Sequence, residues 1–148
     1  MSATYDITLP STNYQHSQQV INAPVTIVKN RFSGADMTVK KGSALVVNDI
    51  FEIITVPAGA LVLDVVATVD TVEGATCTFH LGDGATADGY LASVNGNTSA
   101  NSHSFNCTTT QTFGVGKRYT ADDTIDLKLI SGTAAKLVVD VKVTMILE

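Results

Sequence analysis

The alternation of apolar and polar residues along the second half of the chain predicts β-strands. From Leu61 to Val69, and again from Leu137 to Leu147, every odd position is apolar. Cys77 to Leu81 and Ile125 to Leu129 repeat the pattern over shorter stretches. Successive side chains of a strand point to opposite faces, so a period of two indicates strands with one buried face. We expect residues 61–69 and 77–81 to form an antiparallel pair, joined by a turn at Glu73-Gly74.

The first half of the chain predicts shorter strands. Val25–Lys29, Met37–Lys41 and Ala44–Val47 are strand candidates, separated by turns around Gly34 and Gly42. The segment Phe-Glu-Ile-Ile-Thr-Val at 51–56 is apolar on both sides, which is typical of a central strand or of a strand at an interface.

The remaining segments contain no convincing long helix. Residues 87–94 fit a single helical turn or irregular structure, residues 95–104 an exposed loop, and residues 105–114 a Thr-rich strand. Eight or nine short strands with Gly, Asn and Asp turns predict an all-β fold, an antiparallel β-sandwich. A jelly roll is the favoured arrangement. An immunoglobulin-like sandwich is second, because the chain has no Trp for that core.

Residues 1–24 are polar and show no sustained period, so they predict an extended N-terminal arm before a single β-sandwich domain at 25–148. The arm either frays or lies on a neighbouring subunit. Its adhesive side chains would be Tyr5, Ile7, Leu9 and Tyr14.

The charge balance limits the partners. The net charge is −5 with nine Lys and Arg, which argues against nucleic acid, because phosphate binding needs clustered cations. The doublets Lys40-Lys41 and Lys117-Arg118 are typical of solvated turns. The sequence has no apolar run of membrane-spanning length and no visible secretory signal, so we expect no membrane span and folding in a cytoplasm. Cys77 and Cys107 are then expected to be free, with a disulfide as the alternative.

Candidate chemistry is sparse. His16, His80 and His103 are widely separated and show no metal-ligand or catalytic spacing. Asp83 and Asp88 are the candidates for calcium ligands. Each is followed by a glycine, and the alternative is that these Asp-Gly pairs form tight turns. The sequence therefore predicts no enzyme, no cofactor and no metal.

Four segments resemble small virion proteins of tailed bacteriophages, the capsid decoration or cement proteins. They are V-P-A-G at 56–59 with the following LVLDVVATV, G-D-G-A-T-A-D-G-Y-L at 82–91, Y-T-A-D-D-T-I-D-L at 119–127, and the closing valine-rich strand. The resemblance covers roughly residues 51–148 and leaves 1–50 unmatched. Its motifs are moderately specific, because they describe strands and turns.

This resemblance implies a jelly-roll-like protein on the outer surface of a phage capsid, made in the host cytoplasm, which cements adjacent capsomers. Its partners would be the major capsid protein and itself, as a homodimer or alternatively a homotrimer. Besides the arm, the candidate contacts are Phe51, Ile53, Tyr90 and Leu91. Burial in the sandwich is the alternative for all four. A tail or fibre component that binds a receptor or glycan is the second function, and a β-sandwich enzyme is the third.

Overall fold

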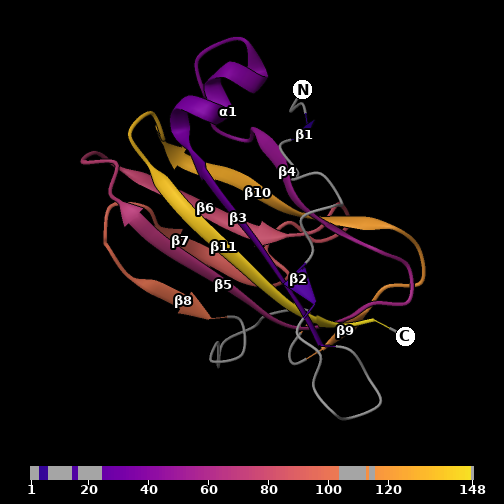
Figure 1. Ribbon diagram of the computed structural model, residues 1–148. Helices are drawn as coiled ribbons and strands as arrows, with labels where there is room; N and C mark the ends of the chain where they lie inside the picture. Colours follow the sequence, from indigo (N-terminus) through magenta and orange to yellow (C-terminus); the bar gives the residue numbers. More distant parts are fainter. Residues whose placement is uncertain (1–3, 7–14, 17–24, 104–112, 114–115, 148) are drawn as a thin grey trace.

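The protein is a sandwich of two β-sheets with a short helix at one end (Figure 1). The computed structural model describes residues 4–6, 15–16, 25–103, 113 and 116–147. The β10 sheet contains, in spatial order, β1 (Thr4–Asp6), β4 (Ile50–Val56), β10 (Asp123–Gly132), β6 (Cys77–Gly82) and β7 (Leu91–Asn95). The β11 sheet contains β2 (Gln15–His16), β3 (Val25–Ser33), β11 (Val138–Ile146), β5 (Leu61–Thr71) and β8 (Asn101–His103), and β9 (Lys117–Arg118) also pairs with β5.

Eight of these strands pair in a nested order. β3 pairs with β11, β4 with β10, β5 with β8, and β6 with β7, all antiparallel. The first strand of the eight thus pairs with the last, and the second with the last but one. This is the pairing of a jelly roll, in which one long antiparallel ribbon folds over into two sheets. The predicted all-β sandwich is confirmed, and its topology is that of a jelly roll.

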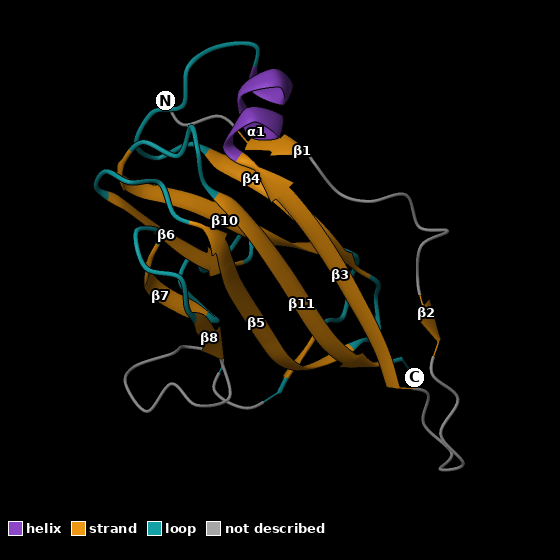
Figure 2. Ribbon diagram, turned by 60° about the vertical axis from the view of Figure 1, so that its left-hand side comes forward, coloured by secondary structure: helices purple, strands orange, loops and turns teal. Residues whose placement is uncertain are grey.

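The core lies between the sheets. β11 shows the predicted alternation over its whole length, because Val139, Val141, Val143 and Met145 are fully buried and the residues between them are half-buried. Figure 2 shows β11 running between β3 and β5, which explains why it carries the most regular pattern in the chain.

Asn30 links the two sheets through the core. It lies on the inner face of β3, and its side-chain amide donates a hydrogen bond to the backbone carbonyl of Ile53, at 2.6 Å. Ile53 is the extra residue of a β-bulge, because the pairing of β4 with β10 skips from Ile54 to Glu52. A bulge leaves one residue outside the regular ladder. Asn30 therefore satisfies a carbonyl that would otherwise be buried without a donor.

The predicted pairing of residues 61–69 with 77–81 is wrong. β5 belongs to the β11 sheet and β6 to the β10 sheet, so the connection between them crosses from one sheet to the other. Glu73 anchors this crossing: its carboxylate accepts from the Thr133 hydroxyl at 2.9 Å and from the backbone N–H groups of Lys136 and Leu137 at 2.7 and 3.0 Å. Alternating apolar and polar residues show that one face of a strand is buried, but they do not identify the strand with which it pairs.

The phase of β5 also differs from the simple alternation. Val62 is fully buried, whereas its neighbours Leu61 and Leu63 are half-exposed. The pairing of β11 with β5 shifts register between Thr144 and Met145, where Asp64 and Val62 are the successive partners. Because of this irregularity, the even-numbered Val62 faces the core at the start of β5, whereas the odd-numbered residues face it further along the strand.

Residues 34–41 form helix α1 (Gly34–Lys41), so the strand expected at 37–41 is wrong. Ser33 and Asp36 form a capping box: the Asp36 backbone N–H donates to the Ser33 hydroxyl, and the Ser33 N–H donates to the Asp36 carboxylate. Gly42 ends the helix with a φ of 77°. The strand expected at 44–47 is also wrong, because these residues belong to the loop that leads into β4.

Three further segments differ from expectation or lie outside the described residues. Residues 91–95 form β7, where a helical turn or irregular structure was expected, and residues 101–103 form β8 within the expected loop. Residues 105–112 and 114 of the expected Thr-rich strand lie outside the described residues. In the N-terminal arm, β1 adds a parallel strand to β4, and β2 pairs antiparallel with β3.

Candidate interaction surfaces

Four of the sequence-predicted contact residues lie in the core. Phe51 and Ile53 are fully buried, because the bulge in β4 lets several consecutive apolar side chains face inward. Tyr90 and Leu91 are 2% and 1% exposed. Burial within the sandwich, the alternative left open for all four, describes their position in this structure.

The arm residues are less uniformly placed. Tyr5 is half-buried, and its ring stacks on Phe51 with the centroids 5.4 Å apart. It therefore covers the edge of the core beside β4. Ile7, Leu9 and Tyr14 lie outside the described residues.

Asp83 organises a buried polar network at the start of the loop 83–90. Its side chain is fully buried and accepts hydrogen bonds from Lys117, from the Tyr119 hydroxyl at 3.1 Å, and from the backbone N–H groups of Ala85 and Thr86. Burial alone would raise the pKa of Asp83, but the hydrogen bond from Lys117 and the backbone donors outweigh it, and the pKa is lowered. Asp83 is therefore a structural anion, not a solvated turn residue.

Aromatic rings surround the cation of this network. The Lys117 ammonium lies 3.7 Å from the centroid of the Phe113 ring and 4.6 Å from that of Tyr119. Tyr90 packs edge-on against Phe113, and its hydroxyl lies 2.9 Å from that of Tyr119. Burial raises the pKa of both tyrosines well above the usual range, so both stay protonated. These contacts hold the loop 83–90 in place, and the polar groups of the network are bonded to one another.

The basic doublets are thus only partly solvated, contrary to expectation. Lys117 pairs with Asp83, and Lys41 pairs with Asp49 at 2.6 Å, with both of the latter side chains less than a tenth exposed. In each doublet the neighbouring cation, Lys40 or Arg118, is exposed. Sequence reasoning missed these pairs, because each cation is separated from its acid along the chain, by 8 residues for Lys41 and Asp49 and by 34 for Lys117 and Asp83.

A second group of acids lies on the outer face of the β10 sheet. Asp126 is directly opposite Glu52 in the pairing of β10 with β4, and it accepts a hydrogen bond from the Thr124 hydroxyl at 2.7 Å. Burial raises the pKa of Asp126 to about 6, and the nearby carboxylates of Glu52, Asp123 and Asp83 act in the same direction, against the hydrogen bond from Thr124. In the described part of the chain, no three His, Cys, Asp or Glu side chains gather as metal ligands.

The other titratable candidates have structural roles. His80 accepts a hydrogen bond at Nδ1 from the backbone N–H of Ser93, at 2.8 Å. Burial lowers the pKa of His80, partly offset by Asp88. Burial raises the pKa of the Cys77 thiol to about 11, so at neutral pH it is a protonated core group and a poor nucleophile. Cys107 and the side chains of His16 and His103 lie outside the described part.

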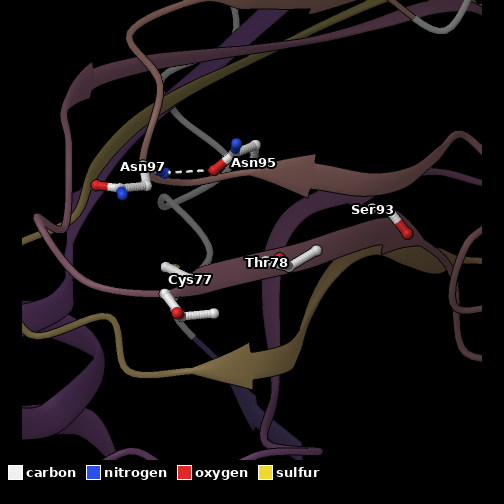
Figure 3. A pocket seen from close by; sticks show the side chains of 6 residues that line it. Cys77, Thr78, Ser93, Asn95 and Asn97 are labelled. Atoms are coloured by element: carbon white, nitrogen blue, oxygen red, sulfur yellow. Dashed lines mark hydrogen bonds between the residues drawn. The ribbon is translucent and has the colours of Figure 1, made fainter.

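A shallow polar groove of about 530 Å³ follows the outer side of β6 and β7 (Figure 3). It is lined by Thr76, Cys77, Thr78, Ser93, Asn95 and Asn97. Figure 3 shows these side chains spread along two neighbouring strands, with Ser93 far from Asn97. The Asn95 side-chain oxygen accepts from the Asn97 backbone N–H at 2.8 Å. The lining holds no aromatic ring and no charged group, so it offers hydrogen bonds without a stacking platform.

The end of the sandwich that carries α1 has a different character. We call it the α1 end; it comprises the connections at residues 34–49, 72–76, 96–100 and 133–137. In the described part of the chain, every large apolar side chain that is exposed lies here, namely Val39 at 82%, Val46 at 54%, Val47 at 45% and Val72 at 36%. Beside them lies a groove of about 210 Å³, lined by Thr38, Ala44, Leu45, Thr133, Ala134 and Ala135. Sequence analysis missed this surface, because it assigned residues 37–41 and 44–47 to two strands.

The molecule is thus a jelly roll, and the large apolar side chains that are exposed among its described residues share one end. No protein-family model matches the chain, and no curated protein matches its sequence. No helix among the described residues has the length and apolar character needed to cross a membrane.

Comparison with solved structures finds the same fold in phage capsids. A chain of the capsid of Ralstonia phage GP4 matches with a TM-score of 0.67 and 14% identity, over 97% of this chain and 98% of that one. A chain of the cyanophage Pam1 capsid matches with a TM-score of 0.59 and 20% identity, over 95% and 98%. A chain of the acid-stable capsid of Helicobacter pylori bacteriophage KHP30 has a TM-score of 0.59 and 13% identity, over 90% and 93%. At these identities the likeness concerns the fold.

Proposed function

We propose that this chain is a non-enzymatic structural protein of a tailed-phage virion, which binds the outer surface of the head and cements adjacent capsomers. One observation carries the proposal: at least 90% of this chain shares its fold with at least 93% of a chain in each of three phage capsid structures. The resemblance of residues 51–148 to decoration proteins points the same way, and it rests on different information, since it comes from motifs in the sequence.

The charge of the chain favours the outside of the head. With a net charge of −5, it would be repelled by packaged DNA, and its nine cations are too few to offset that repulsion. A cement protein also needs little affinity at any one site, because an oligomer that touches several capsomers gains binding through effective concentration.

The proposed partners are the major capsid protein and further copies of this chain. A homodimer is favoured, because a two-fold contact uses one self-complementary surface, and a homotrimer is the alternative. The arm, with Tyr5, Ile7, Leu9 and Tyr14, is proposed to reach along the capsid surface. Synthesis in the host cytoplasm precedes assembly in this scheme.

A tail or fibre component that binds a receptor or glycan is the second candidate. The polar groove on β6 and β7 is the observation that favours it, because hydroxyl and amide groups are suited to sugar hydroxyls. The absence of an aromatic platform in its lining ranks this function lower.

Electron cryomicroscopy of virions from the encoding phage tests the proposal. We expect regular density of this size on the outside of the head shell, and heads made without the protein should release DNA at a lower temperature. Density confined to the tail would favour the second candidate, and unchanged DNA retention would contradict cementing. Sedimentation equilibrium of the purified protein decides between dimer and trimer.

A further inference from the structure

We propose that the α1 end is the face that docks on the head, and that it binds a protein surface with apolar side chains bordered by carboxylates. This inference deepens the proposed function and rests on it. The geometry behind it is the joint placement of exposed valines, an apolar groove and unpaired lysines at one end of an otherwise polar, acidic molecule.

The segregation of apolar side chains is the first argument. Single exposed apolar residues scattered over a protein need no explanation, whereas a group on one face marks an interaction site. Val39 projects from α1 with 82% of its surface exposed, although the same helix buries Met37 almost completely. The helix therefore presents an apolar residue on its outer side as well as its inner side.

The second argument is that the backbone carrying these valines is held rigidly. The Gly34 N–H donates to the Leu137 carbonyl at 2.8 Å, which fixes the start of α1. Asp49 fixes the other end, because its carboxylate accepts from Lys41 and from the backbone N–H of Val46, both within 2.8 Å.

The loop is also tied to β10. The Asn48 N–H donates to the Leu129 carbonyl at 2.8 Å, and the Leu129 N–H donates to the Asp49 carbonyl at 2.9 Å. A surface that is already ordered loses little conformational entropy on binding. The exposed valines are thus held in place for a partner, in contrast to apolar residues on a fraying loop.

The third argument is the charge at this end. The acids of the α1-end connections are engaged internally: Asp49 by Lys41, Glu73 by Thr133 and backbone donors, and Asp36 by the helix cap. Lys40 and Lys136 are exposed, and their side-chain ammonium groups have no hydrogen bond or ion pair with any described residue. The free cations therefore lie beside the exposed valines, and carboxylates on a partner would complement them.

The same charges argue against a second copy as the occupant. A two-fold contact through the α1 end would gather the free Lys40 and Lys136 ammonium groups of both copies in one interface whose acids are already engaged, and like charges across an interface are unfavourable. The opposite end of the molecule, around residues 57–60 and 119–122, exposes no large apolar side chain among the described residues. The outer surface of the capsid shell is therefore the occupant to which we commit.

The test uses full-length protein and expanded heads purified without it, with bound protein measured by co-sedimentation. Val39→Glu and Val46→Glu should each weaken binding at least about tenfold, the loss expected when a buried contact is replaced by a charge. Ala121→Glu adds the same charge at the opposite end and should bind as the wild type does. Lys40→Glu should weaken binding and reduce its dependence on salt, whereas Lys29→Glu, an exposed lysine on the outer face of β3, should do neither.

Four outcomes separate the possibilities. The inference is supported if the two valine variants bind heads more weakly while the control variants do not, and if binding to heads slows hydrogen exchange of the backbone amides at 34–48. If the wild type binds heads and every variant binds equally well, the α1 end is not the docking face, but the proposed function still stands. Failure of the wild type to bind heads overturns both. If the purified protein is an oligomer and Val46→Glu dissociates it, a second copy occupies the α1 end, and the inference is also overturned.

Discussion

Asp83 shows how one carboxylate can hold a whole loop. Its two oxygens accept from Lys117, from Tyr119 and from two backbone N–H groups, in a position fully closed to solvent. The Asp-Gly pair at 83–84 is a common turn signal, and nothing in the neighbouring residues predicts a buried ion pair there. The partner could not be found by spacing, because Lys117 is 34 residues away.

Replacing Asp83 should therefore be far more costly than replacing an exposed acid. Asp83→Ala leaves the Lys117 ammonium and two backbone donors without their acceptor, and we expect the free energy of unfolding to fall by about 3–5 kcal/mol. Asp70→Ala removes only an exposed pair with Arg31 and should cost less than about 1 kcal/mol. Urea unfolding of both variants checks this contrast. Equal losses would mean that the network is not closed to water in solution.

Asp126 should make the protein less stable as the pH rises. Its pKa is raised to about 6 in the folded state, compared with about 4 for an unperturbed aspartate. Between these values the folded state binds a proton that the unfolded chain has lost, so this group lowers the free energy of unfolding as the pH increases from about 4 to 6. Asp126→Asn keeps an oxygen for the Thr124 hydroxyl and removes the charge.

We therefore expect Asp126→Asn to stabilise the protein by about 1–2 kcal/mol at pH 8 and to have little effect at pH 4. Urea unfolding at the two pH values measures the difference. Asp83, whose pKa is lowered, acts in the opposite sense: its contribution is present above about pH 4 and disappears as the pH falls through its folded-state pKa. A stabilisation by Asp126→Asn that is equal at both pH values would contradict the raised pKa.

At the scale of elements, α1 depends on the close approach of its first residue to a neighbouring loop. A Cβ at Gly34 would lie 1.5 Å from the Ala134 carbonyl oxygen, so a side chain there would push the helix away from residues 133–137. We expect Gly34→Ala to lower the free energy of unfolding by about 2–3 kcal/mol through this overlap. Gly84→Ala is the matched control, because a Cβ there meets no atom within 4 Å.

The control should change stability by less than about 1 kcal/mol in either direction. Thermal unfolding followed by circular dichroism compares the two variants. If Gly34→Ala unfolded at the wild-type temperature, the packing of α1 against the loop 133–137 would be looser than described, and the rigidity argued for the α1 end would fail with it.

The elements also differ in how well the sequence predicts them. β11 alternates regularly, because it is flanked by a strand on each side and buries one face throughout, and β10 alternates at Ile125, Leu127 and Leu129. The existence of both strands and the fold class could therefore be inferred. α1 could have been found from the capping box at Ser33-x-x-Asp36 and the Gly at 42, but its eight residues bury too few side chains to produce a clear helical period. Because α1 was not predicted, the α1 end was not predicted either, since three of its four exposed valines fall in segments that the pattern assigns to strands.

The alternation of apolar and polar residues does not predict which strands pair. β5 and β6 are adjacent along the chain and both alternate, yet they lie in opposite sheets. What separates them is the buried Glu73, which ties the crossing to residues 133–137, and a contact over 60 residues leaves no local signature. For the same reason, the motifs that predicted a jelly roll described its strands and turns but not the order in which they pair.

For the whole molecule, the eight nested strands all lie within residues 25–148, so this part should fold without the arm. Removing residues 1–24 takes away β1, β2 and the Tyr5 ring that stacks on Phe51. The loss of this aromatic contact and of two short strand pairings should lower the free energy of unfolding by about 1–3 kcal/mol, while the cooperative transition remains. Tyr5→Ala in the full chain should account for about 1 kcal/mol of that loss.

Unfolding in urea, with the near-ultraviolet signal as a probe of packing, compares the full chain, the shortened chain and Tyr5→Ala. Binding of the same three proteins to undecorated heads then separates the arm from the α1 end as docking elements. If the shortened chain is folded and still binds heads as tightly as the full chain, the arm contributes stability but no contact. If binding is lost while the fold is kept, the arm carries the capsid contact proposed for Tyr5, Ile7, Leu9 and Tyr14. A shortened chain that does not fold at all would contradict the division of the protein at residue 24, because the nested strands would then depend on the two short ones that flank them.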